Sequence, residues 1–452
     1  MATQGTAYSI EGRLPRRKNA GSHLWILAVL PVLVIPLENQ IRIFGFSLAK
    51  LTIFPLLLSV LALNFKQWLI VLRHRVFVSA AAFVGVCAII EGFHPQSDWD
   101  FIYRTLQMLV FGTLIAAVSI DKDTFQRLLY SIALVCSLIA IYLVYNFYGI
   151  VSLDVGGFKQ AGTLRDKAFE QMSLETGLNI LGYTVGLGAV VALAQLFTAK
   201  RNIVRILWGG IYMLCAIGSF IPLSRGAFVA LVIGSMLVMS RNFAKVLKPE
   251  LVMLFILIGI VVISLVPEAL TQRYSVLNPE QEITSKNKEG RLLIYTAALE
   301  ALPEYWAFGV GAGNYWDDWA ADHGFGRMNA FGFGVLGPHN GFLAAWIYFG
   351  LPGFLLLCLM CISAAFACPR SKDQPLESAV LLGLLGLGLM WMLFTHSLYL
   401  KPFGVILGLI VGGSIRARFQ IQRQVRLPFM RHPEVARPVA GQLSRVSGGP
   451  EK

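Results

Sequence analysis

Residues 337–361 read GPHNGFLAAWIYFGLPGFLLLCLMC, and this stretch indicates most directly how the chain folds. From Asn340 onward the run has no charged side chain, and it is long enough for a helix that crosses the hydrocarbon core of a bilayer. A hydrophilic segment of roughly 70 residues precedes it, by the same reading of apolar periodicity. His339 therefore stands where a water-exposed segment enters the membrane, and an ionisable side chain at that border is a candidate for chemistry.

The composition of the 452 residues agrees with a membrane location. Hydrophobic residues make up 56% of the chain and charged residues 14%, and the mean hydropathy is +0.65. In a soluble domain the charged share would be about a quarter. An ordinary soluble fold is therefore excluded, and the chain is expected to be an all-α polytopic membrane protein.

Apolar stretches of span length recur along the whole chain. We expect about twelve transmembrane helices, near residues 24–37, 43–64, 76–93, 101–119, 128–150, 174–198, 203–222, 225–240, 251–267, 340–361, 378–398 and 402–415. Pro31 and Pro36 interrupt the first stretch and no small-residue cleavage site follows it, so we do not interpret it as a cleaved signal peptide.

The basic residues predict the orientation, because Lys and Arg accumulate in short cytoplasmic loops. With the N-terminus inside, 25 of the 38 Lys and Arg residues fall in inside segments, whereas 17 of the 25 Asp and Glu residues fall outside. The formal net charge of +13 is then a topology signal, and no nucleic-acid partner is expected.

This topology divides the chain into five parts. They are a cytoplasmic tail (1–23), transmembrane helices 1–9 (24–267), a large periplasmic loop (268–339), transmembrane helices 10–12 (340–415) and a basic cytoplasmic tail (416–452). The last tail is expected to be disordered and drawn to anionic membrane lipids. All six cysteines fall in spans or at a cytoplasmic edge, so no disulfide is expected.

The large loop is rich in aromatic residues, which either form an interfacial belt or stack on sugar rings. They are Tyr274, Tyr295, Tyr305, Trp306, Tyr315, Trp316 and Trp319. A helix is expected from Gly290 to about Pro303. Arg291 lies in its first turn, where a cation opposes the helix dipole and favours an anionic partner.

Arg225 and His339 share a geometry, since each begins a span that runs from outside to inside. Helix N-termini favour anions, so the two ends together with Arg225 and Arg291 would form a phosphate clamp if the fold brings them together. The same field keeps His339 neutral and able to accept a proton. The alternatives are that Arg225 reaches lipid phosphates and that His339 is an interfacial hydrogen-bonding residue.

Three further motifs are weaker signals. Asp98-Trp99-Asp100 and Asp121-Lys122-Asp123 match an Asp-x-Asp metal-binding pattern, but we interpret both as loop charges. Residues 309–314 (GVGAGN) form a Gly-rich turn that would let the backbone approach a ligand, without the strand and the Lys-Ser pair of a phosphate-binding loop. No metal or cofactor is expected.

Taken in order, these residues resemble the O-antigen ligase and Wzy-type polymerase superfamily. The resemblance rests on SRGA (224–227), GR (290–291), GVGAG (309–313), PHNGFL (338–343) and FGLPG (349–353). It implies a GT-C-like, metal-independent glycosyltransferase at the periplasmic face of the bacterial inner membrane, which moves glycan from an undecaprenyl-diphosphate donor onto an acceptor.

By this resemblance Arg225 and Arg291 hold the diphosphate, and His339 is the catalytic base. Two guanidinium groups can neutralise the leaving group in place of a metal. In the absence of a marked outside nucleophile, single displacement with inversion is favoured. Residues that could assist the base or bind sugar are Glu289, Tyr295, Glu300, Trp316, Asp317, Asp318 and Asn340.

The acceptor separates the subclasses. A polymerase extends one repeat unit with another, a ligase uses lipid A core, and an oligosaccharide transferase uses protein. We favour a polymerase for exopolysaccharide, capsule or O-antigen, with other polysaccharide export proteins as candidate partners, because the long loop gives room for a second glycan. The contrasting class is a transporter of lipid-linked sugars, which would carry charges in mid-membrane.

Overall fold

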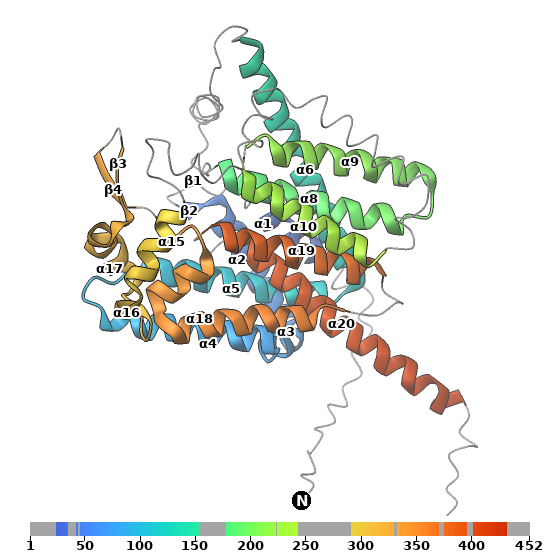
Figure 1. The fold of residues 1–452 in the computed structure, drawn as a ribbon. Coiled ribbons are helices and arrows are strands. Elements are labelled where there is room, and N and C mark those ends of the chain that lie inside the picture. Colours follow the sequence, from blue (N-terminus) through green and yellow to red (C-terminus); the bar gives the residue numbers. More distant parts are fainter. Residues whose placement is uncertain are drawn as a thin grey trace, which may run out of the picture.

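The computed structural model describes residues 24–34, 42–43, 46–153, 178–222, 224–242, 291–329, 332–335, 337–369, 375–395 and 401–431. They form a bundle of long helices with a folded loop at one end (Figure 1). The helices are α1 (Leu24–Val34), α2 (Leu48–Leu63), α3 (Phe65–Leu72), α4 (Arg75–Phe93), α5 (Trp99–Ser119), α6 (Lys122–Leu153), α8 (Leu178–Thr198), α9 (Asn202–Phe220), α10 (Arg225–Ser240), α18 (Gly341–Ala367), α19 (Pro375–Phe394) and α20 (Lys401–Arg431).

The expected helical, multi-pass membrane fold is confirmed. Eight of the described helices are long and apolar enough to cross a membrane, or nine if the bent pair α2 and α3 makes one span. α1 and α10 are apolar but shorter. The expected span at 251–267 lies outside the described residues, so the total of twelve stays a prediction.

The N-terminal part differs from the expected single helix at 43–64. Arg42–Ile43 (β1) pairs antiparallel with Phe46–Ser47 (β2), and α2 begins only after this hairpin. Aromatic and β-branched residues favour strands, and the apolar count alone did not separate them from the helix. The chain then bends by 102° between α2 and α3.

The C-terminal helix also differs from expectation. α20 continues to Arg431, so residues 416–431 are helical where a disordered tail was expected. Arg and Gln, which are frequent in this segment, are good helix formers, and a helix already started in the membrane is extended without a new nucleation step. The rest of the tail, 432–452, lies outside the described residues.

Small residues let α5 and α20 pack closely along much of their length. A Cβ on Gly112 would come within 2.9 Å of the Gly404 carbonyl oxygen, and one on Gly408 within 2.6 Å of the Gly112 carbonyl oxygen. Close backbone approach through small residues is how helices associate where lipid gives no hydrophobic driving force. The two helices therefore form one tightly packed unit of the bundle.

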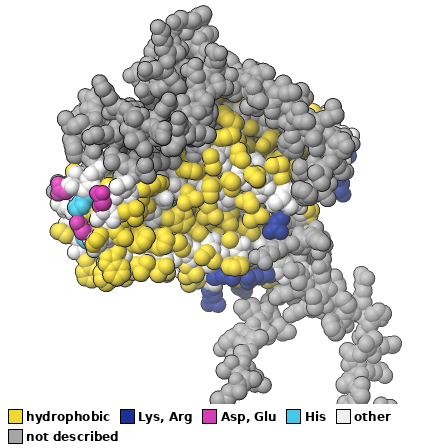
Figure 2. Space-filling view, in the orientation of Figure 1, with side chains coloured by type: hydrophobic (Ala, Val, Ile, Leu, Met, Phe, Trp, Pro, Cys, Tyr) yellow, Lys and Arg dark blue, Asp and Glu magenta, His cyan; other side chains and the backbone are white. Residues whose placement is uncertain are grey.

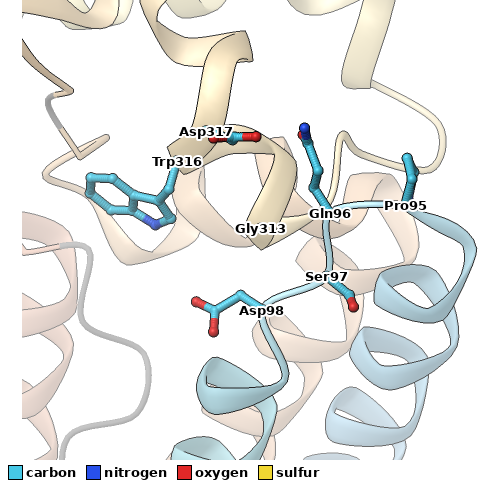
Figure 3. Close-up of a pocket in the computed structure, with 7 residues that line it drawn as sticks. All are labelled: Pro95, Gln96, Ser97, Asp98, Gly313, Trp316 and Asp317. Carbon is cyan, nitrogen blue, oxygen red and sulfur yellow. The ribbon is translucent and has the colours of Figure 1, made fainter.

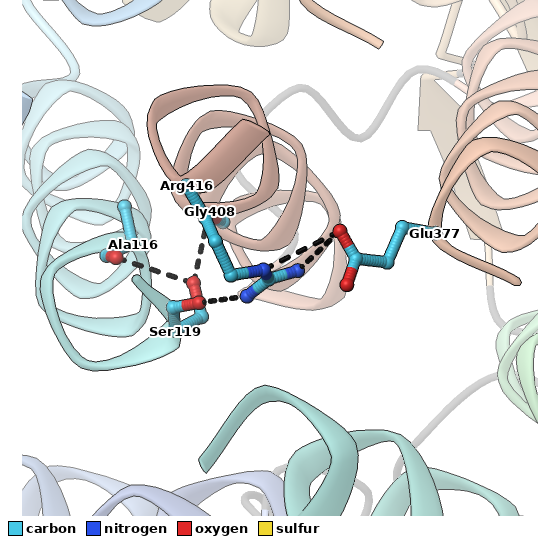
Figure 4. Close-up of polar contacts among 5 residues, drawn as sticks. All are labelled: Ala116, Ser119, Glu377, Gly408 and Arg416. Atoms are coloured by element: carbon cyan, nitrogen blue, oxygen red, sulfur yellow. Dashed lines mark hydrogen bonds and ion pairs between the residues drawn. The ribbon is translucent and has the colours of Figure 1, made fainter. Parts of the chain in front are cut away.

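A buried ion pair holds one end of this unit (Figure 4). The Arg416 guanidinium on α20 lies 2.9 Å from the Glu377 carboxylate on α19 and donates to the Ser119 carbonyl oxygen at the end of α5 over 2.6 Å. It also lies over the Phe125 ring of α6, 4.2 Å from its centroid. Four helices are therefore linked through one buried arginine.

The surface of the bundle is apolar over a broad band (Figure 2). Exposed side chains such as Leu58, Ile89, Leu134, Ile203 and Leu355 contribute to the apolar surface of the described residues. On the face drawn in Figure 2, acidic side chains and histidines gather at the end that carries the loop, and Lys and Arg side chains gather away from it. Such a surface is what a bilayer would cover.

Residues 291–329 and 332–335, which precede α18, form a compact loop. Its elements are α15 (Arg291–Glu300), α16 (Leu302–Tyr305), α17 (Ala312–Asn314), the π-helical turns η2 (Tyr315–Trp319) and η3 (Ala321–Phe325), and the antiparallel strands β3 (Gly326–Asn329) and β4 (Gly332–Val335). The expected helix at 290–303 is therefore present as α15. α16 follows it and contains Pro303 in its first turn.

α18 is kinked at Gly350, and the kink docks the loop onto the bundle. Gly350 has a φ of 61°, which favours glycine, and a Cβ there would come within 2.4 Å of the Ala307 carbonyl oxygen. The Leu351 amide donates to the Trp306 carbonyl oxygen over 2.9 Å. The loop therefore contacts α18 directly at the kink, through Gly350 and Leu351.

Candidate active site at one end of the bundle

Arg225 is the first residue of α10, and its neighbours explain the motif around it. The Ser224 hydroxyl caps the helix by accepting a 3.3 Å hydrogen bond from a first-turn amide. A Cβ on Gly226 would come within 2.2 Å of the Tyr183 hydroxyl and 2.8 Å of the Phe394 Cβ. The motif thus combines a helix cap, a cation and a small residue that lets α8 and α19 pack against the start of α10.

His339 lies just before α18 in a rare backbone conformation. Its φ is 50°, and it is the one residue other than glycine with a positive φ in the described part of the chain. The Asn340 side-chain oxygen caps the helix by accepting from the Phe342 and Leu343 amides over 2.9 and 3.2 Å. Backbone strain of this kind concentrates at functional sites, where the surrounding structure fixes it.

These two helix starts lie at the same end of the bundle. Phe394, at the end of α19, contacts the start of α10. α18 and α19 are consecutive long helices joined by the short segment 368–374, so the start of α18 and the end of α19 share one end of the bundle. α19 packs against both α10 and α18. The common end expected for Arg225 and His339 is therefore present.

The Gly-rich turn packs against α18 through backbone hydrogen bonds. Gly309 and Gly311 have φ values of 76° and 80°. The Val310 amide donates to the Ile347 carbonyl oxygen and the Gly311 amide to the Tyr348 carbonyl oxygen, each over 2.9 Å. The turn is thereby fixed to the helix that His339 precedes.

The Gly-rich turn binds a carboxylate that belongs to the chain itself. Glu91, near the end of α4, has no exposed surface, and its carboxylate accepts from the Ala312 amide over 2.7 Å, the Gly313 amide over 2.9 Å and the Asp98 amide over 2.5 Å. The turn was expected to let the backbone approach a ligand; two of its amides are instead engaged by a buried side chain. Sequence reasoning missed Glu91, although it is the one charged residue within 76–93.

Most of the other residues predicted from the sequence lie in the loop. Arg291 begins α15 and Asp318 lies in η2, both described by their backbone. Tyr295 is half-buried on α15. Glu289 lies outside the described residues. Asn340 is foremost a helix cap, so its side-chain oxygen is already engaged.

The loop aromatics separate into a core and a surface. Tyr305, Tyr315 and Trp319 are buried, and Tyr315 lies 5.0 Å from the Tyr348 ring centroid of α18. Burial raises the pKa of the Tyr305 hydroxyl to about 12. These three residues therefore belong to the hydrophobic core of the loop and form neither an interfacial belt nor a surface on which a sugar could stack. Trp306 and Trp316 are exposed to 53% and 37%.

The loop also holds an ion pair between Glu304 and His323, two residues that sequence reasoning did not select. The Glu304 carboxylate accepts from the Trp319 indole over 2.9 Å and lies 3.0 Å from His323 Nε2. The His323 ring stacks on Trp319 with centroids 4.2 Å apart. Isolated positions along the sequence give no signal for such a three-residue contact.

The two Asp-x-Asp motifs serve as helix starts in the structure. Asp98 accepts from the Phe101 amide over 3.1 Å, and Asp100 pairs with Arg104. Asp121 accepts from the Thr124 amide over 2.8 Å. Their interpretation as loop charges agrees with these contacts.

Part of the chain matches a known protein family. Residues 210–358 match the family model for O-antigen ligase, a segment that contains Arg225, Arg291, the Gly-rich turn and His339. The resemblance of this segment to the O-antigen ligase superfamily is thereby confirmed. The match supports a ligase- or polymerase-type activity with lipid-linked glycan and acceptor substrates. No curated protein matches the chain.

Proposed function

We propose that this protein is a glycosyltransferase that polymerises undecaprenyl-diphosphate-linked repeat units into exopolysaccharide, capsule or O-antigen. The observation that carries the proposal is the common placement of Arg225 and His339. Each stands at the start of an apolar helix, at the same end of the bundle, inside the segment that matches the O-antigen ligase family.

In the proposed mechanism His339 removes the proton from an acceptor hydroxyl. The oxygen attacks the anomeric carbon of the donor, and the bond from that carbon to the diphosphate oxygen breaks. Arg225 and Arg291 stabilise the charge that develops on the departing undecaprenyl diphosphate. Attack on the face opposite the leaving group inverts the configuration, and the two guanidinium groups take the place of a metal ion.

The positions of buried charge support an enzyme over a transporter. Glu91, Glu377, Lys401 and Arg416 are the buried Asp, Glu, Lys and Arg side chains among the described residues. The first three lie near helix ends. Arg416 is in the middle of α20 but lies beside the end of α5 and the start of α19. A transporter of lipid-linked sugars would be expected to place such groups at mid-membrane, in broken helices. A ligase that uses lipid A core is the closer alternative, because it needs the same donor site.

We further propose that the chain lies in the bacterial inner membrane with both termini in the cytoplasm and the loop in the periplasm. The separation of acidic and basic side chains in Figure 2 supports this orientation. The test is labelling of Asp317→Cys in a cysteine-free variant with an impermeant maleimide. Reaction only from the cytoplasmic side would reverse the assignment.

The main experiment incubates purified protein in nanodiscs with undecaprenyl-diphosphate-linked repeat units and a metal chelator. Wild type is expected to form a ladder of products. His339→Ala is expected to lower the rate about 10²–10⁴-fold through loss of the base, and Arg225→Ala roughly 10²–10³-fold through loss of charge stabilisation. Arg104→Ala removes an exposed arginine paired with Asp100 and is the matched control.

The products distinguish the alternatives. A single product on added lipid A core, without a ladder, would indicate a ligase. Movement of the lipid-linked sugar across the membrane without a new glycosidic bond would contradict the enzyme proposal. Full activity of correctly folded His339→Ala would remove the histidine from the mechanism.

A further inference from the structure

A pocket of about 760 Å³ opens beside the Gly-rich turn (Figure 3). One wall is the connection between α4 and α5, and the other is the start of α17 and η2. The lining residues are Pro95, Gln96, Ser97, Asp98, Gly313, Trp316 and Asp317. The volume lies within the range of about 300–1,000 Å³ that is typical of small-molecule sites.

The two walls are fixed to one another by a buried carboxylate. Glu91 accepts a hydrogen bond from Asp98 in one wall and from Gly313 in the other. The walls also touch directly, since a Cβ on Gly313 would lie 1.9 Å from the Gln96 carbonyl oxygen. A pocket held in this way needs little ordering when a ligand binds, which favours affinity.

The lining chemistry suits a carbohydrate. The exposed indole of Trp316 offers an apolar face for the C–H groups of a sugar ring. Asp98, Asp317, Gln96 and Ser97 offer oxygen and amide groups for sugar hydroxyls. In Figure 3 the Asp98 carboxylate and the Trp316 ring project to the same side of Gly313.

The charge of the pocket restricts the kind of sugar. Asp98 and Asp317 are both carboxylates, and the described lining contains no Lys, Arg or His. A uronic acid or another anionic sugar would meet like charge, whereas a neutral or amino sugar would not. The lining therefore favours neutral or amine-bearing residues.

The pocket is joined to the helix that follows His339. The Gly-rich turn bonds to Ile347 and Tyr348 of α18, which lie about 10 Å along the helix from its start. A ligand in the pocket would therefore contact the protein away from the reacting hydroxyl.

We infer that this pocket is a saccharide subsite that holds neutral or amino sugars of the glycan substrate away from the reacting bond. The inference rests on the proposed function for the origin of the saccharide. Binding to the pocket does not require turnover, so it can be tested separately. The occupant is either the donor glycan or the acceptor glycan, and the experiment distinguishes the two.

The probe is the neutral oligosaccharide repeat unit, freed from its lipid diphosphate, and binding to full-length protein is measured by calorimetry. Trp316→Ala is expected to weaken binding roughly tenfold or more through loss of the central aromatic contact. Trp316→Phe restores most of the binding. Trp306→Ala, which removes an exposed tryptophan outside the pocket, leaves binding unchanged.

Asp98→Asn tests the charge argument. Asparagine is an equally good helix cap, so the start of α5 is preserved while one negative charge is removed. Binding of an oligosaccharide of equal length that contains a uronic acid is expected to improve, relative to the neutral probe.

Turnover by Trp316→Ala assigns the occupant. A raised KM for the acceptor with unchanged kcat places the acceptor glycan in the pocket, and a raised KM for the donor places the donor glycan there. Equal binding of the neutral probe by wild type and Trp316→Ala would overturn the subsite, even if His339 and Arg225 prove essential. Saccharide binding that depends on Trp316 would support it even if no polymer forms.

Discussion

At the scale of the residue, the contact between His323 and Glu304 makes the loop sensitive to pH. Partial burial lowers the pKa of His323, but the hydrogen bond to the Trp319 carbonyl and the Glu304 carboxylate together raise it above its usual value. Hydrogen bonds from Trp319 and His323 lower the pKa of Glu304. Both groups are therefore charged together over a wider range of pH than their usual pKa values allow.

The sign of the stability change follows from these directions. The contribution of His323 is complete below its usual pKa of 6.5 and is lost as pH rises through its raised pKa; that of Glu304 is complete above 4.5 and is lost as pH falls through its lowered pKa. Amide-exchange protection of η3 is expected to be highest between these values, with an effect under about 1 kcal/mol because the pair is partly exposed. His323→Gln should flatten the profile, and an unchanged profile would contradict the prediction.

At the scale of the element, Glu91 joins α4, the start of α5 and the Gly-rich turn. Glu91→Ala would leave three backbone donors without their acceptor, and the free energy of unfolding is expected to fall by roughly 2–4 kcal/mol. Thermal unfolding in detergent measures the loss. Glu300→Ala, on the exposed side of α15, is the control and is expected to change stability by less than about 0.5 kcal/mol. A Glu91→Ala protein as stable as wild type would show that the carboxylate is not needed to hold the walls.

The elements also show which parts of the fold the sequence could predict. Long apolar runs predicted the helices because burial in lipid requires internally satisfied backbone groups. The hairpin β1–β2, the bend between α2 and α3 and the helical continuation of α20 were not predicted. The first two depend on local pairing and direction, and an apolar count does not contain them.

At the scale of the whole molecule, Arg416 stabilises the bundle through α19 and α5. Arg416→Ala would leave the Glu377 carboxylate buried without its cation, and the expected loss of stability is about 3–5 kcal/mol. The double variant Arg416→Met with Glu377→Met removes both charges and is expected to regain much of the loss. Thermal unfolding of the two variants checks this, and equal instability of both would indicate that the charges themselves are needed.

The candidate site likewise combines residues that local sequence patterns predict with residues whose role depends on contacts between distant segments. Ser224, Arg225, His339 and Asn340 could be selected from sequence because caps, isolated cations and span borders are local patterns. The burial of Tyr305, Tyr315 and Trp319 could not, since an aromatic residue in a loop suits a belt, a sugar platform or a core equally well. Which of these it becomes depends on the segments that fold against it.

The membrane class, the approximate spans and the two helix starts that carry Arg225 and His339 could be predicted from sequence, because hydrophobic length and helix capping act over a few neighbouring residues. Two other features depend on tertiary contacts: the Glu91 carboxylate accepts hydrogen bonds from the Gly-rich turn, and residues 95–98 meet residues 313–317 in a polar pocket. These contacts join segments more than 200 residues apart. Their partners are selected by helix packing, which no local pattern encodes.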